Sequence, residues 1–81
     1  MTGGIIEIDL HGARLDEARD RIDEALRNAD MSVYRLRVIH GYHGGTALRD
    51  AIRTQYKNHP KVRRIEIGLN PGQTDLVLRE L

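Results

Sequence analysis

Two His-Gly pairs stand at matching places in the sequence, and their residue types are the ones best suited to chemistry. Residues 8–12 (IDLHG) and 37–41 (RVIHG) each end a segment typical of a β-strand. If the two strands are parallel, His11 and His40 emerge together at the carboxyl edge of the sheet, where open α/β sheets bind ligands. Because imidazole titrates near neutral pH, the two corners predict a site for general acid–base catalysis.

Asp9 lies two residues before His11, so in an extended strand both side chains project to the same side, about 7 Å apart along the backbone. A carboxylate beside an imidazole fixes its tautomer and raises its basicity, which suits proton transfer near pH 7. The alternative is a strand-end histidine that makes only structural hydrogen bonds. Two corners beside a glycine-rich loop favour a site, with Asp9, His11 and His40 as its candidate catalytic residues.

The second corner leads through this loop to the predicted start of a helix. Three glycines among residues 41–45 are incompatible with a regular element, and their backbone can adopt positive φ. Free N–H groups at a helix N-terminus bind phosphate, and Arg49 would add positive charge there. Tyr42 could stack on a base or pack back onto the loop. The candidate phosphate- or nucleic-acid-binding residues are Gly41, Tyr42, His43, Gly44, Gly45, Thr46 and Arg49.

Other catalytic motifs fit this sequence less well. The loop lacks the Gly-Lys-Ser/Thr ending of a P-loop, and the only serine, Ser32, is not in a Gly-x-Ser-x-Gly elbow. Asp9, His11, His40 and His43 could hold a divalent metal such as Mg²⁺, so the cofactor is left open between a metal and none.

Six elements in the order β-α-β-α-β-β are expected to position these residues. The spacing of apolar residues predicts strands over 5–10, 33–40, 61–69 and 74–78, and helices from Leu15 to about Ala29 and from a cap at Thr46 to before Asn58. Strands that alternate with helices should be parallel with right-handed crossovers, whereas the turn at 70–73 predicts a final antiparallel hairpin.

Two helices cover only one face of a four-stranded sheet, so the expected fold is a two-layer α/β sandwich, a mixed sheet with both helices on one face. The open face should carry Glu7, Arg35, Arg37, Arg64 and Glu66. These side chains would form either solvated cross-strand charge pairs or a binding surface.

Length, charge and composition bound the functions that this chain can have. Its 81 residues suffice for one domain, expected over 1–81, and 40% apolar with 31% charged residues are typical of a soluble globular protein. The net charge of +1 argues against binding to nucleic acid mainly by bulk charge. Residues 1–31 hold four basic and eight acidic side chains, and residues 32–81 hold nine and four, so an anionic partner is expected at the second half.

The sequence also lacks several features. It has no cysteine, which excludes disulfides and thiolate catalysis. No apolar run is long enough to span a membrane and no signal peptide is recognisable, so no membrane partner and a cytoplasmic location are expected.

Three motifs resemble those of the Smr (small MutS-related) domain family. Residues 8–12, with Glu17-Ala18 in the helix after them, resemble its hydrophobic-Asp-Leu-His-Gly opening. Residues 38–49 resemble its His-Gly-x-Gly loop ending in Leu-Arg, and residues 72–78 resemble its closing Gly-x-Thr-x-Val-x-Leu strand. The resemblance covers essentially the whole chain.

This resemblance implies a sandwich similar to the C-terminal domain of translation initiation factor three. It also implies endonucleolytic nicking or cleavage of RNA or DNA, by a domain that stands alone or ends a MutS-type protein. By position, the family's functional residues correspond to Asp9, His11, His40, Gly41, Gly44 and Gly45. The loop departs from the family pattern because it is one residue longer, and Arg14 replaces the usual Ser or Thr helix cap.

The expected function is therefore that of a Smr-like endonuclease domain with nucleic acid as its partner. The alternative is a non-catalytic RNA- or DNA-binding module. In that module, phosphates would be held by Arg35, Arg37, Arg49, Arg53, Arg63 and Arg64.

Overall fold

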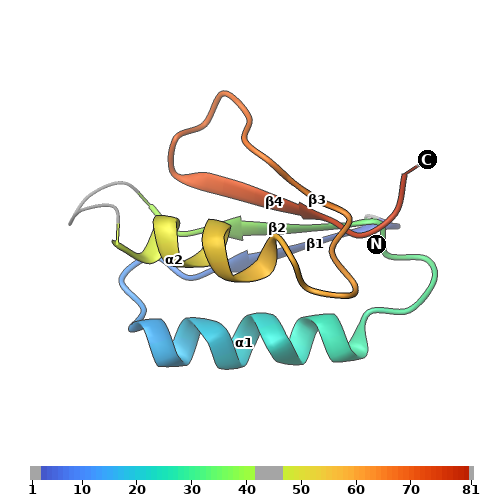
Figure 1. The fold of residues 1–81 in the computed structure, drawn as a ribbon, viewed down its shortest axis with the longest axis horizontal. Coiled ribbons are helices and arrows are strands. Elements are labelled where there is room, and N and C mark those ends of the chain that lie inside the picture. The colour runs from blue at the N-terminus through green and yellow to red at the C-terminus, as the bar shows by residue number, and fades with distance from the viewer. Residues whose placement is uncertain (1–2, 42–46, 81) are drawn as a thin grey trace.

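The computed structural model describes residues 3–41 and 47–80, which form one four-stranded sheet and two helices (Figure 1). The elements in chain order are β1 (Ile5–Asp9), α1 (Leu15–Asn28), β2 (Arg35–Ile39), α2 (Ala47–Tyr56), β3 (Arg64–Glu66) and β4 (Gln73–Val77). The order β-α-β-α-β-β agrees with the sequence-based prediction. Within the described residues, neither helix combines the length and the apolar character needed to cross a bilayer.

The sheet is mixed, with the strand order β1-β2-β4-β3. β1 pairs with β2 in parallel, and β4 is antiparallel to both of its neighbours, β2 and β3. The predicted final hairpin is therefore confirmed. β4, the last strand in the chain, lies in the interior of the sheet, between β2 and β3.

Both helices pack on one face of the sheet (Figure 1). In α1, Ala18, Ile22 and Leu26 recur every four residues and are buried, which gives the helix its apolar stripe. The alternate side chains of the central strands, Leu36 and Val38 in β2 and Leu76 in β4, complete this core together with Leu10, Ile52 and Tyr56. Arg14 occupies the N-cap position of α1 and makes no side-chain capping hydrogen bond there.

β3 is shorter than predicted. The apolar alternation of residues 61–69 indicated a long strand, but pairing with β4 stops at Glu66 opposite Asp75. Gly68 and the turn formers at 70–72 lead the chain out of the sheet, so Ile67 and Leu69 are exposed in a loop.

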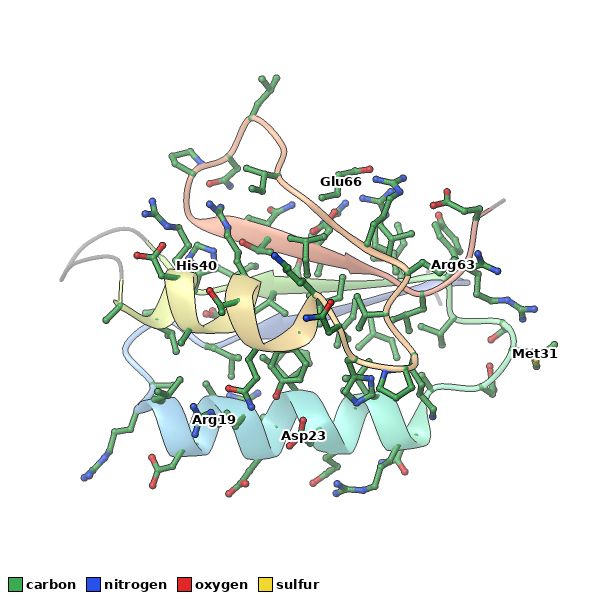
Figure 2. The ribbon with its side chains drawn as sticks, viewed as in Figure 1. Arg19, Asp23, Met31, His40, Arg63 and Glu66 are labelled. Carbon is green, nitrogen blue, oxygen red and sulfur yellow. The ribbon has the colours of Figure 1, made fainter. Side chains whose placement is uncertain are left out.

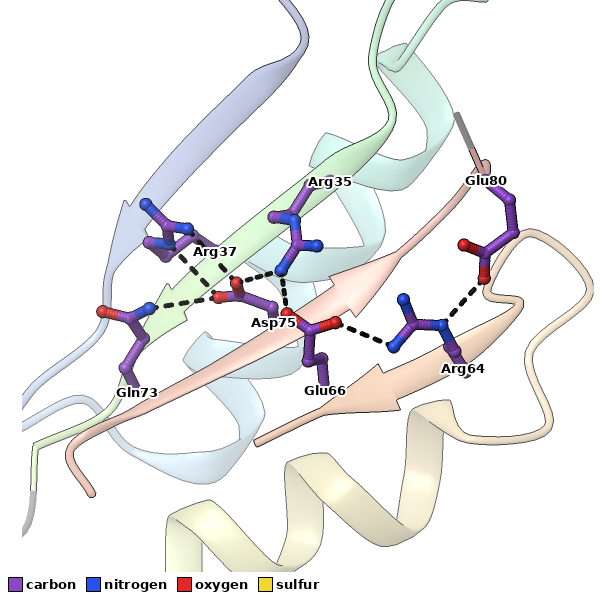
Figure 3. A network of polar contacts seen from close by, with 7 residues as sticks. All are labelled: Arg35, Arg37, Arg64, Glu66, Gln73, Asp75 and Glu80. Carbon is purple, nitrogen blue, oxygen red and sulfur yellow. Dashed lines mark hydrogen bonds and ion pairs between the residues drawn. The ribbon is translucent and has the colours of Figure 1, made fainter. Parts of the chain in front are cut away.

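Charged side chains cover the open face of the sheet, and Figure 2 shows Glu66 on the opposite side of the sheet from Arg19 and Asp23 of α1. Arg35 Nη1 donates to Glu66 Oε1 at 2.5 Å and to Asp75 Oδ2 at 2.7 Å (Figure 3). Arg37 also donates to Asp75. Arg64 bridges Glu66 and Glu80 at 2.8 Å each.

The expected cross-strand charge pairs are thus present. Three arginines face three carboxylates, so the network carries no net charge. A phosphate would have to compete with carboxylates that already hold these guanidinium groups. The open face is therefore a structural surface that does not favour phosphate binding.

This network makes the free energy of unfolding depend on pH in the acid range. Hydrogen bonds from Arg35 and Arg64 lower the pKa of Glu66 to about 2 from its usual 4.5. Because the folded-state pKa is the lower one, this stabilisation is complete above about pH 4.5 and is lost as the pH falls towards 2. We expect urea unfolding of the wild type to become easier between pH 5 and pH 2, and Glu66→Gln to flatten that dependence. Parallel pH profiles of the two proteins would contradict this account.

Candidate active site

Asp9 and His11 form a hydrogen-bonded pair where β1 ends. Asp9 Oδ1 accepts hydrogen bonds from His11 Nδ1 at 2.5 Å and from the His11 backbone N–H at 3.2 Å. A carboxylate only accepts, so Nδ1 carries the proton and Nε2 is the ring nitrogen that Asp9 does not use. The His11 side chain is 73% exposed. The pair thus presents an oriented imidazole to solvent.

Asp9 is held in its ionised form. The two hydrogen bonds from His11 lower the pKa of Asp9, and the positive charge of Arg21 acts in the same direction. Arg21 also donates to the Asp9 backbone carbonyl, which links the end of β1 to α1. A carboxylate that stays charged keeps its hydrogen bond to His11 Nδ1 and so fixes the orientation of the ring.

The two His-Gly corners lie side by side. Gly12 and Gly41 have nearly the same positive φ, 75° and 76°, a conformation that glycine adopts without steric cost. The Leu10 N–H donates to the Ile39 carbonyl at 2.7 Å across the parallel strands. A Cβ atom placed on Gly41 would lie 3.4 Å from the His11 Cβ. The backbone of the second corner therefore lies directly beside His11.

His40 has a different environment from His11. Its residue is only 5% exposed, and both of its ring nitrogens are hydrogen-bonded. Nδ1 donates to the Gly41 carbonyl at 2.8 Å, Nε2 accepts from Thr74 Oγ1 at 2.9 Å, and Arg53 Nε donates to the same Thr74 oxygen at 2.9 Å. Burial lowers the pKa of His40, and the charges of Arg53 and Arg49 add to this effect. The ring is therefore neutral near pH 7.

Strand parity explains this difference between the histidines. His40 continues the alternation of Leu36 and Val38, whose side chains are buried against the helices, and Figure 2 shows it beside the first turns of α2. Asp9 has the opposite parity and is exposed, as is His11 two residues later. The structure brings the two backbone corners together, but the ring nitrogens of His40 bond to Gly41 and Thr74 and not to the exposed pair. The predicted sharing of acid–base work between two imidazoles therefore has no hydrogen bond to support it in this geometry.

The backbone beyond His40 is held by the last turn of the chain. The N–H groups of His40 and Gly41 both donate to the Gly72 carbonyl, at 2.9 and 3.0 Å. α2 begins at Ala47, and Arg49 in its first turn donates to Asp50. Five of the predicted phosphate-binding residues, Tyr42, His43, Gly44, Gly45 and Thr46, lie outside the described residues.

Sequence reasoning did not assign site roles to Thr74 and Gly72. Both belong to the closing Gly-x-Thr-x-Val-x-Leu motif, which was the available signal. Within residues 3–41 and 47–80, no three His, Asp or Glu side chains gather as a metal site would require. Asp9 and His11 instead bond to each other.

A mixed four-stranded sheet covered by two helices, with an Asp–His pair at its carboxyl edge, defines a small α+β domain of the Smr type. The Smr domain family model matches residues 8–72. The chain belongs to the Smr domain family.

Its relatives include bacterial proteins named Endonuclease MutS2. The chain is 35% identical to that of Geobacillus kaustophilus over 78 residues, which are 94% of this chain and 10% of that protein. It is 36% identical to that of Bacillus cytotoxicus over 64 residues, 78% of this chain and 8% of that protein. The chain thus spans about a tenth of the length of these curated relatives.

Solved Smr domains have the same fold. The Smr domain of Thermus thermophilus MutS2 superposes with a TM-score of 0.81 at 32% identity, covering 93% of this chain and 99% of that one. The SMR domain of NEDD4-binding protein 2 gives a TM-score of 0.68 at 25% identity, covering 99% of this chain and 92% of that one.

Proposed function

We propose that this domain is an endonuclease that binds nucleic acid and nicks or cleaves phosphodiester bonds of RNA or DNA. The observation that carries the proposal is the exposed hydrogen bond between Asp9 and His11 at the carboxyl edge of the sheet. The pair combines an exposed imidazole, which can take up and release a proton, with a carboxylate that fixes its tautomer, and these are the components of general acid–base catalysis. The family relation to proteins named endonucleases agrees with this assignment.

In RNA cleavage, His11 Nε2 takes the proton of the 2′-hydroxyl. The 2′-oxygen then forms a bond to phosphorus, the bond from phosphorus to O5′ breaks, and O5′ takes up a proton from the imidazolium or from water. The products are a 2′,3′-cyclic phosphate and a free 5′-hydroxyl. In DNA there is no 2′-hydroxyl, so His11 would deprotonate a water molecule, whose oxygen forms a bond to phosphorus while the bond from phosphorus to the leaving 3′- or 5′-oxygen breaks. That oxygen takes up a proton from the imidazolium or from water. In both reactions the Asp9 carboxylate stabilises the imidazolium as it forms.

The residues around the second corner bind the phosphate in this proposal and do not transfer protons. Gly41 and Arg49, with Tyr42, His43, Gly44, Gly45 and Thr46, hold the phosphate, since the first N–H groups of α2 have no partners within the helix. His40 holds this corner in place through the Gly41 carbonyl and is a positioning residue.

Thr74→Val tests the positioning role of His40. The substitution removes the hydroxyl that serves His40 Nε2 and Arg53 Nε, so two groups lose their partner. We expect a loss of about 1–3 kcal/mol in the free energy of unfolding, together with slower cleavage. Thr74→Ser keeps the hydroxyl and should retain both properties. The ¹⁵N shift of His40 Nε2, which accepts from the Thr74 hydroxyl, should be the same in wild type and the Ser variant and should change in the Val variant. Identical shifts in all three proteins would refute the relay from Thr74 to His40.

The proposed function is tested by incubating the purified domain with structured RNA and with supercoiled plasmid, each in Mg²⁺ and in EDTA. New termini or nicked circles are expected for at least one substrate, and the EDTA arm reports whether cleavage needs a divalent metal. Binding with both substrates left intact would favour the binding module instead. Such a module would have few free arginines, because Arg35, Arg37 and Arg64 are paired with carboxylates. Its affinity would then fall only shallowly with salt.

A further inference from the structure

We propose that the loop between β3 and β4 carries an apolar finger, formed by Ile67 and Leu69, that packs against the bases of nucleic acid bound at the Asp9–His11 pair. The inference rests on the proposed function and adds to it a residue pair that contacts bases rather than phosphates. It assigns to the domain a means of selecting unstacked or distorted sites.

The exposure of these two side chains is the first observation. Ile67 is 58% exposed and Leu69 is fully exposed. Among the described residues, only two other large apolar side chains are exposed, Leu15 and Met31, and they lie on other parts of the chain. An exposed apolar side chain lacks the stabilisation that burial gives. Two such side chains, Ile67 and Leu69, on one short loop therefore suggest a surface that is covered on binding.

The second observation is the attachment of the finger to the site. Asn70 Oδ1 accepts from the Gly72 N–H at 2.9 Å, and the Asn70 carbonyl accepts from the Gln73 N–H at 3.2 Å, which closes the base of the loop. The Gly72 carbonyl in turn accepts from the N–H groups of His40 and Gly41. The finger thus has a fixed base that is bonded directly to the second His-Gly corner.

The direction of the finger and its distance from the Asp9–His11 pair allow one strand of nucleic acid to contact both. The loop rises from the sheet on the side away from the helices, at the end where β4 begins (Figure 1). Ile39 pairs with both Asp9, the last residue of β1, and Gln73, the first residue of β4, so the end of β1 and the start of β4 lie about 10 Å apart, two strand spacings. Stacked nucleotides rise about 3.4 Å each, so the base of the finger lies about three nucleotides from a phosphate at His11.

The size of the finger favours bases over a protein partner. A stable protein interface buries about 800 Å² on each side, far more than two aliphatic side chains on a narrow tip provide. The neighbouring open face adds a neutral, internally paired charge network rather than an apolar surface. Leucine and isoleucine are, in contrast, the kind of side chain that inserts between base steps and unstacks them.

The test uses 2-aminopurine, whose fluorescence rises when it is unstacked, placed two to four nucleotides from the cleavage position of a substrate that the wild type cuts. In a His11→Ala background, which keeps the substrate whole, binding should raise the fluorescence. Adding Ile67→Ser and Leu69→Ser should abolish that rise and weaken binding at least tenfold, because tenfold is already the factor expected when a single leucine is no longer buried. Met31→Ser is the matched control, because Met31 is 76% exposed and lies at the opposite end of the molecule (Figure 2).

The outcomes separate this proposal from the proposed function. If the wild type cleaves while the double variant keeps both the fluorescence rise and the affinity, the finger is refuted and the nuclease stands. An equal loss in Met31→Ser would also refute it, because the effect would not be specific to the loop. If the wild type neither binds nor cleaves any nucleic acid, the proposed function fails first. Thermal melts should show that all serine variants fold, since the altered side chains are exposed.

Discussion

Replacement of His11 by alanine is expected to slow cleavage by about 10²–10⁴-fold, the usual contribution of a general acid–base group. Among the described residues at this edge of the sheet, His11 is the exposed histidine whose ring bonds to a carboxylate through Nδ1 and leaves Nε2 for proton transfer. The variant removes this imidazole. Because the His11 side chain is 73% exposed, the free energy of unfolding should change little. Single-turnover cleavage under saturating enzyme measures the chemical step directly.

Two variants on the same strand sharpen this experiment. Asp9→Asn keeps the shape of the side chain but removes the charge that supports the imidazolium, so it should also slow cleavage. Glu7→Gln is the matched control, since Glu7 is an exposed carboxylate two residues earlier on β1, and it should leave the rate unchanged. Equal rates for wild type and His11→Ala would place the activity elsewhere on the protein or in a contaminant.

The largest effect on stability is expected from Asp75→Ala. The Asp75 side chain is 7% exposed and accepts hydrogen bonds from Arg35, Arg37 and Gln73. Its loss would leave the Arg35 guanidinium, on a side chain that is 18% exposed, with Glu66 alone. Removing one partner of a buried ion pair costs about 3–5 kcal/mol, a large part of the stability of a small domain.

Urea unfolding at pH 7 checks this expectation. Asp75→Asn retains an acceptor oxygen and should cost less than the alanine variant. Glu80→Gln changes the outer end of the same network, where the Glu80 side chain is 53% exposed, and should change the free energy of unfolding little. If the alanine variant of Asp75 were no less stable than Glu80→Gln, the network would be a set of surface pairs of little energetic importance.

The elements were predictable where local patterns decide structure. α1 follows the predicted span because its apolar positions recur every three or four residues, and β1, β2 and β4 lie within a residue or two of their predicted bounds. β3 was predicted too long, because Ile67 and Leu69 continue a strand-like alternation although no partner strand faces them. The order of the strands in the sheet depends on packing between segments that are distant in the sequence. It therefore cannot be predicted from the local pattern of apolar and polar residues.

The candidate site was predictable in part for the same reason. Spacing of two residues indicated that Asp9 and His11 share a face, and the structure shows them bonded. The same rule of alternation, applied to Leu36, Val38 and His40, would have indicated that His40 points into the helix-covered side. Its partners Thr74 and Arg53 come from β4 and α2, and only folding brings them together.

The interior position of β4 determines when the sheet can be completed during synthesis. β1, α1 and β2 emerge from the ribosome first, and β3 then emerges with no strand to pair with until residues 73–77 follow. The two parts of the sheet are joined only by this late strand, through pairings of long sequence separation that slow folding. Damage to β4 would therefore divide the sheet into two parts, whereas damage to an edge strand would only shorten it.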